Sequence, residues 1–172
     1  MINPVVEKAL NDQINAELYS AYLYLSMAAA LEDMGLPGFA NWTRIQNEEE
    51  TFHAMKIYDF IIERGGRVKL TSIDTPPSEW KDLVTIFQEI LKHEQHVTAL
   101  INKLMDTAIE QKDHATNMFL QWFVTEQVEE EANVDEVLQQ LNLAQESKGA
   151  LFMLDKDMGT RTFTPPGAEG GA

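Results

Sequence analysis

The chain has no cysteine and few basic residues, and each absence narrows what it can do. Without cysteine it can form neither a disulfide framework nor a thiolate site for zinc or an iron–sulfur cluster. Thirteen Lys and Arg stand against 28 Asp and Glu, which gives a net charge of −15. Neutralising phosphates takes clustered Lys and Arg, so we expect no nucleic-acid partner. An acidic field attracts cations, although solubility alone would also explain it.

Long apolar runs are also missing. No segment approaches the roughly 18 uncharged apolar residues that a membrane span needs, so we expect no membrane association. The first residues, MINPVVEKALNDQ, lack the basic and apolar stretches of a signal peptide. Together with the lack of cysteine, these features predict a cytoplasmic protein. The 172 residues suffice for one domain with a buried core.

Glycine and proline are concentrated in a few clusters, which divide the chain into helices. We predict four long helices and a short fifth, over 4–34, 38–64, 79–111, about 113–145, and 150–158. The domain is therefore expected to span 1–158. The remainder, 159–172, ends in TPPGAEGGA and is predicted to be a flexible tail.

The lengths of the helices and of one linker predict how the helices are connected. Helices of this length span roughly 40–50 Å, which suits a bundle. The first break, Gly35 to Gly38, permits only an antiparallel hairpin. The linker 65–78 spans at most about 46–50 Å when extended, enough to run back along the bundle. We therefore predict an all-α four-helix bundle with one long crossover and a short fifth C-terminal helix.

Acidic residues interrupt the apolar stripe of every long helix. These stripes follow the three- and four-residue spacing of a buried helix face. The interrupting polar residues are Glu17, Glu50 with His53, Glu94, and Gln127 with Glu130. None of the stripes carries Lys or Arg. Because a buried carboxylate is costly unless it is paired or binds metal, the pattern favours a bound cation.

These residues also lie at one depth along the bundle. The midpoints of the predicted helices fall near residues 19, 51, 95 and 129, and each interrupting residue lies within two positions of its midpoint. This holds for either direction of each helix, because reversing a helix leaves its midpoint at the same level of the bundle. A polar layer without metal is the alternative interpretation.

The types of ligand indicate the metal. Carboxylates with one imidazole suit Fe(II), Fe(III) or Mn(II). A glutamate can bridge two metal ions, and two bridged irons can together reduce O₂ or peroxide. We assign Glu17, Glu50 and His53 to a first iron. We assign Glu50, Glu94 and Glu130 to a second.

Seven stretches resemble the prokaryotic non-haem ferritins, over nearly the whole chain. They are NAELYSAYLYLSMAA (15–29), GFANW (38–42), NEEETFHAMK (47–56), ERGGRVKL (63–70), PPSEW (76–80), FLQWFVTEQVEEEA (119–132) and LFMLDK (151–156). The E-x-x-H of Glu50 and His53 is weak alone but specific together with the other acidic positions. The resemblance implies a ferritin-like bundle and a ferroxidase. It also implies a hollow shell of 24 subunits that stores ferric mineral.

The resemblance further implies a third iron site beside the pair. Its matching positions are Glu49, Glu126, Glu129 and Glu130. The last three form one patch on a helix, next to the stripe. For Glu126 and Glu129, a solvated acidic face is the alternative.

Three neighbouring residues are given supporting roles. Tyr24 resembles the family's tyrosine beside the centre, and Trp122 resembles its redox-active aromatic residue. Core packing is the alternative for both. Gln127 is neutral, so we expect it to orient a ligand or face peroxide instead of binding metal.

Departures from related families are also informative. Bacterioferritins and rubrerythrins carry a second E-x-x-H where this chain has Gln127 and Glu130, so the two iron sites should be unequal. Thr51 stands where bacterioferritins place their haem-ligating Met, so no haem is expected. His93 and His96 are expected at the surface.

Two other functions remain possible at this point. One is a di-iron peroxidase or oxygenase without storage. The short helix over 150–158 argues against it, because the resemblance gives that helix a place at an assembly axis. The other is a bundle without metal that serves structure or interaction.

Overall fold

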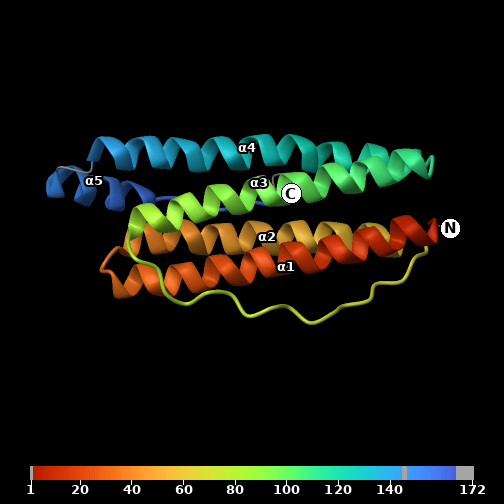
Figure 1. Ribbon diagram of the computed structural model, residues 1–172, viewed down its shortest axis with the longest axis horizontal. Helices are drawn as coiled ribbons and strands as arrows, with labels where there is room; N and C mark the ends of the chain where they lie inside the picture. Colours follow the sequence, from red (N-terminus) through yellow and green to blue (C-terminus); the bar gives the residue numbers. More distant parts are fainter. Residues whose placement is uncertain (1, 145–146, 166–172) are drawn as a thin grey trace, which may run out of the picture.

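The computed structural model describes residues 2–144 and 147–165 as a bundle of helices. In chain order the helices are α1 (Pro4–Asp33), α2 (Pro37–Glu63), α3 (Leu83–Glu110), α4 (His114–Ala144) and α5 (Lys148–Met158). The four long helices lie side by side, and α5 sits at one end of the bundle (Figure 1). The predicted all-α architecture is confirmed. No helix in the described part is long and apolar enough to cross a membrane.

Local chemistry sets the helix ends. Gly35 and Gly65 follow α1 and α2 with φ of 74° and 70°, a left-handed conformation that glycine adopts without steric cost. The predicted start of the third helix, at residue 79, was four residues too early. The Asp82 side chain accepts a hydrogen bond of 2.8 Å from the Thr85 amide, which fixes the start of α3 at Leu83.

The linker between α2 and α3 is the predicted crossover. It runs along the outside of the bundle beside α1 (Figure 1). Side chains of α1 hold its carbonyls: Asn11 donates to Arg67 (3.1 Å), Asn15 to Ser72 (2.9 Å) and Ser26 to Pro77 (2.6 Å). Because these contacts advance in step along both segments, the linker travels the length of α1. The bundle therefore consists of two antiparallel pairs, α1–α2 and α3–α4.

The short helix α5 is anchored to the start of α2. One oxygen of Asp155 accepts hydrogen bonds from the amides of Gly38 (2.9 Å) and Phe39 (3.0 Å). These amides lie in the first turn of α2, where no partner within the helix exists. A Cβ atom at Gly38 would lie 1.5 Å from the Asp155 carbonyl oxygen. Glycine is therefore required where the two helices meet.

The apolar core falls into two clusters at opposite ends of the bundle. One gathers around residues such as Met27, Phe39 and Phe87, and the other around Leu10 and Ile101. Each long helix contributes to both clusters, and the residues between its two contributions are those that interrupt the apolar stripes. A buried polar layer thus separates the two halves of the core.

Beyond α5 the chain turns back along α2. Asn41 donates hydrogen bonds to the carbonyls of Met158 (3.3 Å) and Arg161 (3.1 Å), and Phe163 meets Phe52 with ring centroids 5.9 Å apart. In the first part of the expected flexible tail, Arg161 and Phe163 are therefore half-buried, whereas the other residues of 159–165 are exposed. Residues 166–172, which complete that expected tail, lie outside the described part of the chain.

Candidate metal centre

One buried glutamate from each long helix meets in the polar layer. The exposed fractions are 1% for Glu17, 1% for Glu50, 0% for Glu94 and 3% for Glu130. The buried polar residues of the described chain include no Lys or Arg. Four acids thus share a low-dielectric space with no buried basic side chain to neutralise them.

The first group comprises Glu17, Glu50 and His53. One potential ligand atom from each lies within 4.8 Å of the others, and His53 Nδ1 is 3.4 Å from Glu50 Oε2. Gln13 donates a hydrogen bond of 3.0 Å to Glu17 Oε1. The other oxygen, Oε2, is buried without a partner among the described residues. A buried acceptor that lacks a donor fits a cation.

The second group comprises His53, Glu126 and Glu130. Their potential ligand atoms also lie within 4.8 Å of one another, and His53 Nε2 is 3.9 Å from Glu126 Oε1. Gln46 donates a hydrogen bond of 2.8 Å to Glu130 Oε2. This group differs from the set assigned to a second iron, because it contains His53 and Glu126 in place of Glu50 and Glu94.

Glu94 is held by neutral donors instead. The Tyr24 hydroxyl donates to Glu94 Oε1, and the Gln127 amide donates to Oε2 at 3.2 Å. Gln127 also lies 3.3 Å from the Thr98 hydroxyl, so its amide is fixed from two sides. Tyr24 is completely buried. In this arrangement Tyr24 and Gln127 orient a carboxylate that belongs to neither three-residue group.

Burial and mutual repulsion raise the pKa of every carboxyl in the layer. Burial raises the pKa of Glu17 to about 7, and the charge of Glu94 adds to the effect. Burial and neighbouring acids raise the pKa values of Glu50 and Glu130 well above their usual range. Burial also raises the pKa of Glu94, against the opposing hydrogen bonds from its two donors. The layer therefore favours protons, or a cation in their place.

The pKa of His53 is shifted in the opposite direction. Burial, with a smaller effect of the Lys56 charge, lowers the pKa of His53 to about 4. At neutral pH its imidazole is therefore uncharged, the form that binds metal. Trp122 packs against it with ring centroids 5.4 Å apart, and Lys56 Nζ lies 4.5 Å from the centroid of the Trp122 ring. Trp122 thus lies between the His53 ring and the Lys56 ammonium group.

The four positions implied for a third iron are not gathered in one group. Glu126 and Glu130 belong to the second group, whereas Glu129 is exposed. Glu49 pairs with Arg161, whose Nη2 lies 2.7 Å from Glu49 Oε2. Burial raises the pKa of Glu49 to about 7, although the Arg161 charge opposes the shift.

Sequence reasoning missed three residues that hold the site. Gln13 and Gln46 each lie four residues before a predicted ligand and donate into the layer. Their helical spacing was a usable signal. Arg161 had no such signal, because it lies far along the chain from Glu49.

The expectation for His93 was wrong. This residue is half-buried, with Nε2 2.8 Å from the Ser20 hydroxyl and its ring 5.9 Å from that of Tyr19. Both contacts come from α1. His96 is exposed, as expected.

Comparison with known proteins places these observations in a family. The Ferritin-like domain of the Ferritin family matches residues 7–144. The bacterial non-heme ferritin of Bacteroides fragilis is 40% identical over 161 residues, which are 94% of this chain and 100% of that protein. The bacterial non-heme ferritin of Staphylococcus saprophyticus is 40% identical over 163 residues, covering 95% and 98% of the two chains.

Solved structures that resemble this chain support the same family assignment. An engineered closed form of Archaeoglobus fulgidus ferritin is 51% identical, with a TM-score of 0.94 over 95% of this chain and 100% of that one. The open-pore ferritin from the same organism is 51% identical, with a TM-score of 0.93 over 94% and 100%. With the buried carboxylate layer already described, this chain belongs to the ferritin family as a prokaryotic non-haem ferritin, a protein that stores iron.

Proposed function

We propose that the chain is a ferroxidase that oxidises Fe(II) to Fe(III) in its polar layer and stores the product as ferric mineral. One observation carries this proposal: four buried glutamates and a neutral histidine share one layer, and the described residues include no buried basic residue to balance them. Hard oxygen ligands with a single imidazole suit iron. Fe(II) is thus the substrate that brings the missing positive charge.

The described groups support specific roles for the ligands. Glu17, Glu50 and His53 would hold one Fe(II), because their ligand atoms already converge. Glu130 and Glu94 would hold the second, with Glu50 as the bridge. For this, Glu94 must turn one oxygen from its neutral donors toward the metal. Protons leave the carboxyls as iron binds, because the bound forms are ionised.

The redox step needs two irons close together. Each Fe(II) loses one electron, and O₂ takes up both electrons with two protons to give H₂O₂. Peroxide can serve as the oxidant in the same way, taking two electrons and two protons to give two molecules of water. The donor on the other oxygen of Glu94, Tyr24 or Gln127, would keep this carboxylate oriented during this change.

We further propose that Glu49, Glu126, Glu129 and Glu130 form a third iron site on the way to storage. Glu126 and Glu130 already share a group with His53, which supports this route. Storage would take place inside a hollow homo-oligomer of 24 subunits in the cytoplasm. We expect no haem, because Thr51 follows the proposed bridge and offers no thioether ligand.

Aerobic loading with Fe(II), followed by sizing, tests the proposal. Ferric absorbance should appear, and the particle should have a mass of about half a megadalton, from 24 chains of 19.5 kDa, and hold far more iron than its di-iron sites. A small oligomer with two irons per chain would favour a di-iron oxygenase or peroxidase. No ferric absorbance would favour a bundle without metal.

Replacing the proposed bridge tests the site directly. Glu50→Ala should abolish fast oxidation and leave the helix content unchanged, because it removes a ligand from both irons. Glu48→Ala is the matched control, since Glu48 is an exposed acid on the same helix. Stopped-flow absorbance and circular dichroism measure the two effects. Wild-type oxidation by Glu50→Ala would exclude Glu50 as the bridge.

A further inference from the structure

The segment after α5 carries a positive charge to the edge of the metal centre. Residues 159–165, here called the C-terminal strap, turn back along α2 (Figure 1). Asn41 donates hydrogen bonds to the carbonyls of Met158, the last residue of α5, and of Arg161 in the strap. Phe163 packs edge-on against Phe52. The backbone of Arg161 is thus held on both sides. The strap thus fixes one guanidinium beside α2.

Arg161 is bound in three ways at this position. Its Nη2 donates to Glu49 Oε2 at 2.7 Å, its Nη1 donates to the Trp42 carbonyl at 3.5 Å, and its guanidinium lies 4.6 Å from the centroid of the Trp42 ring. The two charged side chains are only 21% and 15% exposed, so salt screens the pair less than a surface pair. The Arg161 charge also opposes the pKa rise of Glu130.

We propose that Arg161 is a latch on the third iron site, holding the Glu49 carboxylate until a divalent cation displaces it. This inference rests on the third site proposed above. A cation cannot share the same carboxylate oxygen with the guanidinium without direct repulsion. Two positive charges attract the cluster of acids more strongly than one does, so displacement is favourable once iron arrives. The strap therefore sets the affinity of the site.

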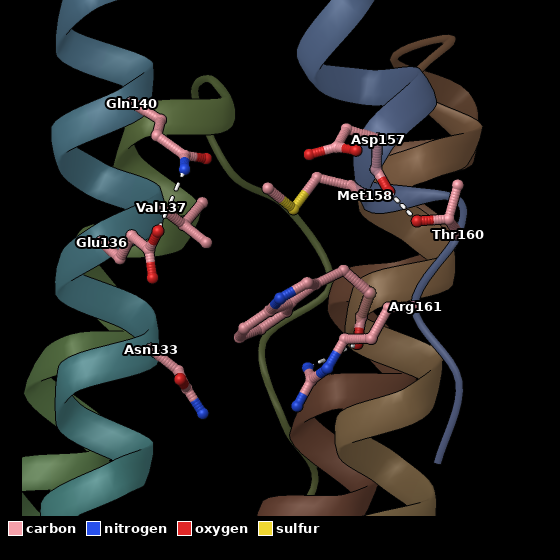
Figure 2. Close-up of a pocket in the computed structure, with 9 residues that line it drawn as sticks. Asn133, Glu136, Val137, Gln140, Asp157, Met158, Thr160 and Arg161 are labelled. Atoms are coloured by element: carbon pink, nitrogen blue, oxygen red, sulfur yellow. Dashed lines mark hydrogen bonds between the residues drawn. The ribbon is translucent and has the colours of Figure 1, made fainter.

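A cavity beside the latch can receive the displaced guanidinium. It has a volume of about 280 Å³ and lies between α4 and the strap (Figure 2). Figure 2 shows Arg161 on one wall and Glu136 and Gln140 of α4 on the other. Asp157 also lines it, and the buried Oε1 of Gln140 has no hydrogen-bond partner among the described residues. Two carboxylates and a free acceptor can thus bind the released donor groups.

Zinc titration of the full-length protein tests the latch. Zn²⁺ does not change oxidation state, and it binds carboxylates and imidazole, so calorimetry counts the sites without oxidation. The wild type should bind three Zn²⁺ per chain, and Glu49→Gln should lose the weakest event. Arg161→Gln should tighten that event about tenfold, the worth of one charge-assisted hydrogen bond. Arg161→Lys keeps the charge and should stay nearer to the wild type.

A matched control and an optical signal separate the latch from a general change in charge. Arg44→Gln removes the same charge from α2, but Arg44 pairs with the exposed Glu32, so the weakest event should not change. When Trp80 and Trp122 are replaced by Phe, Trp42 is the remaining tryptophan. Zn²⁺ should shift its fluorescence when Arg161 is present, and it should cause no shift when Arg161→Gln is added.

The outcomes distinguish the latch from the site beneath it. If Glu49→Gln loses an event but Arg161→Gln binds like the wild type, the third site stands and the latch is wrong. If Glu49→Gln keeps every event of the wild type, Glu49 binds no cation and both proposals fail. A tightening in Arg44→Gln equal to that in Arg161→Gln would also overturn the latch.

Discussion

Single side chains around Glu94 show how a buried acid is held without a cation. Two neutral donors, the Tyr24 hydroxyl and the Gln127 amide, occupy its two oxygens. Glu17 differs, because one of its oxygens has a donor in Gln13 while the other has none among the described residues. Hydrogen bonds thus satisfy only part of the layer. The Glu17 oxygen that lacks a donor belongs to the group that contains His53.

Removing the Tyr24 hydroxyl should weaken the metal-free fold. In Tyr24→Phe the oxygen of Glu94 loses its donor in a fully buried place, so we expect a loss of about 1 to 3 kcal/mol in the free energy of unfolding. Urea unfolding of the metal-free protein measures this loss. Tyr22→Phe, on the exposed face of α1, should change stability little. Equal stability of the two variants would show that the hydrogen bond contributes nothing net.

The metal-free protein should lose stability as pH rises from about 4.5 to about 7. The pKa of Glu17 is raised from 4.5 to about 7 in the fold, so in this window the folded chain binds more protons than the unfolded chain. Stability is then full below 4.5 and falls with pH, by at most about 1.4 kcal/mol per pH unit for each such carboxyl.

Urea midpoints across this pH window measure the effect, and Glu17→Gln provides the comparison. The variant cannot ionise at this position, so its stability should fall less steeply than that of the wild type. Parallel pH profiles for the two proteins would contradict the assignment of the shift to Glu17.

At the scale of elements, the contact between α2 and α5 depends on a glycine inside a helix. Alanine is normally preferred over glycine at such a position, by up to about 1 kcal/mol. At Gly38 that preference is overridden, because a Cβ atom would collide with the Asp155 backbone. The same contact lets Asp155 cap the first turn of α2.

Gly38→Ala should therefore detach α5 without unfolding the bundle. The added Cβ atom and the Asp155 carbonyl oxygen cannot stay 1.5 Å apart, so α5 must move. The amides of residues 38 and 39 then lose the Asp155 carboxylate as their acceptor. Hydrogen exchange should become faster in α5 and in the first turn of α2. Gly149→Ala, inside α5, is the control, because a Cβ atom there would meet another atom only at 3.9 Å. Any change in hydrogen exchange that this variant causes should be a slowing.

For the whole molecule, apolar side chains at the α5 end of the bundle are left uncovered by the single chain. Leu143, Phe152 and Met153 are 87%, 62% and 65% exposed. They lie where α4 ends and α5 begins. The ferritin structures that resemble this chain support a homo-oligomer, and such side chains are suited to contacts between subunits.

Phe152→Asp should accordingly reduce the size of the assembly. A buried charge at a subunit contact is costly, so we expect smaller particles in size-exclusion chromatography with light scattering. Far-UV circular dichroism should stay unchanged, because Phe152 makes little contact within its own chain. Phe152→Leu keeps the apolar surface and should keep the full size. An intact particle in Phe152→Asp would place this residue outside the interfaces.

The bundle and its polar layer were predictable from local spacing. Helical periodicity placed Glu17, Glu50 and Glu94 on buried faces, and the linker was long enough for one crossover. The start of α3 was predicted too early because the residues before Asp82 favour a helix. The side chain of Asp82 caps α3, so the extended linker continues up to this residue. His93 was misjudged because the cover over it comes from α1.

The sequence by itself determined that acids without basic partners lie at mid-height on four helices, because period and length are properties of each segment alone. Only the tertiary structure decided which donor each oxygen accepts, and that Arg161 reaches Glu49 across 112 positions of the chain. Contacts of that kind depend on how the ends of helices dock. No periodicity within either segment encodes that docking.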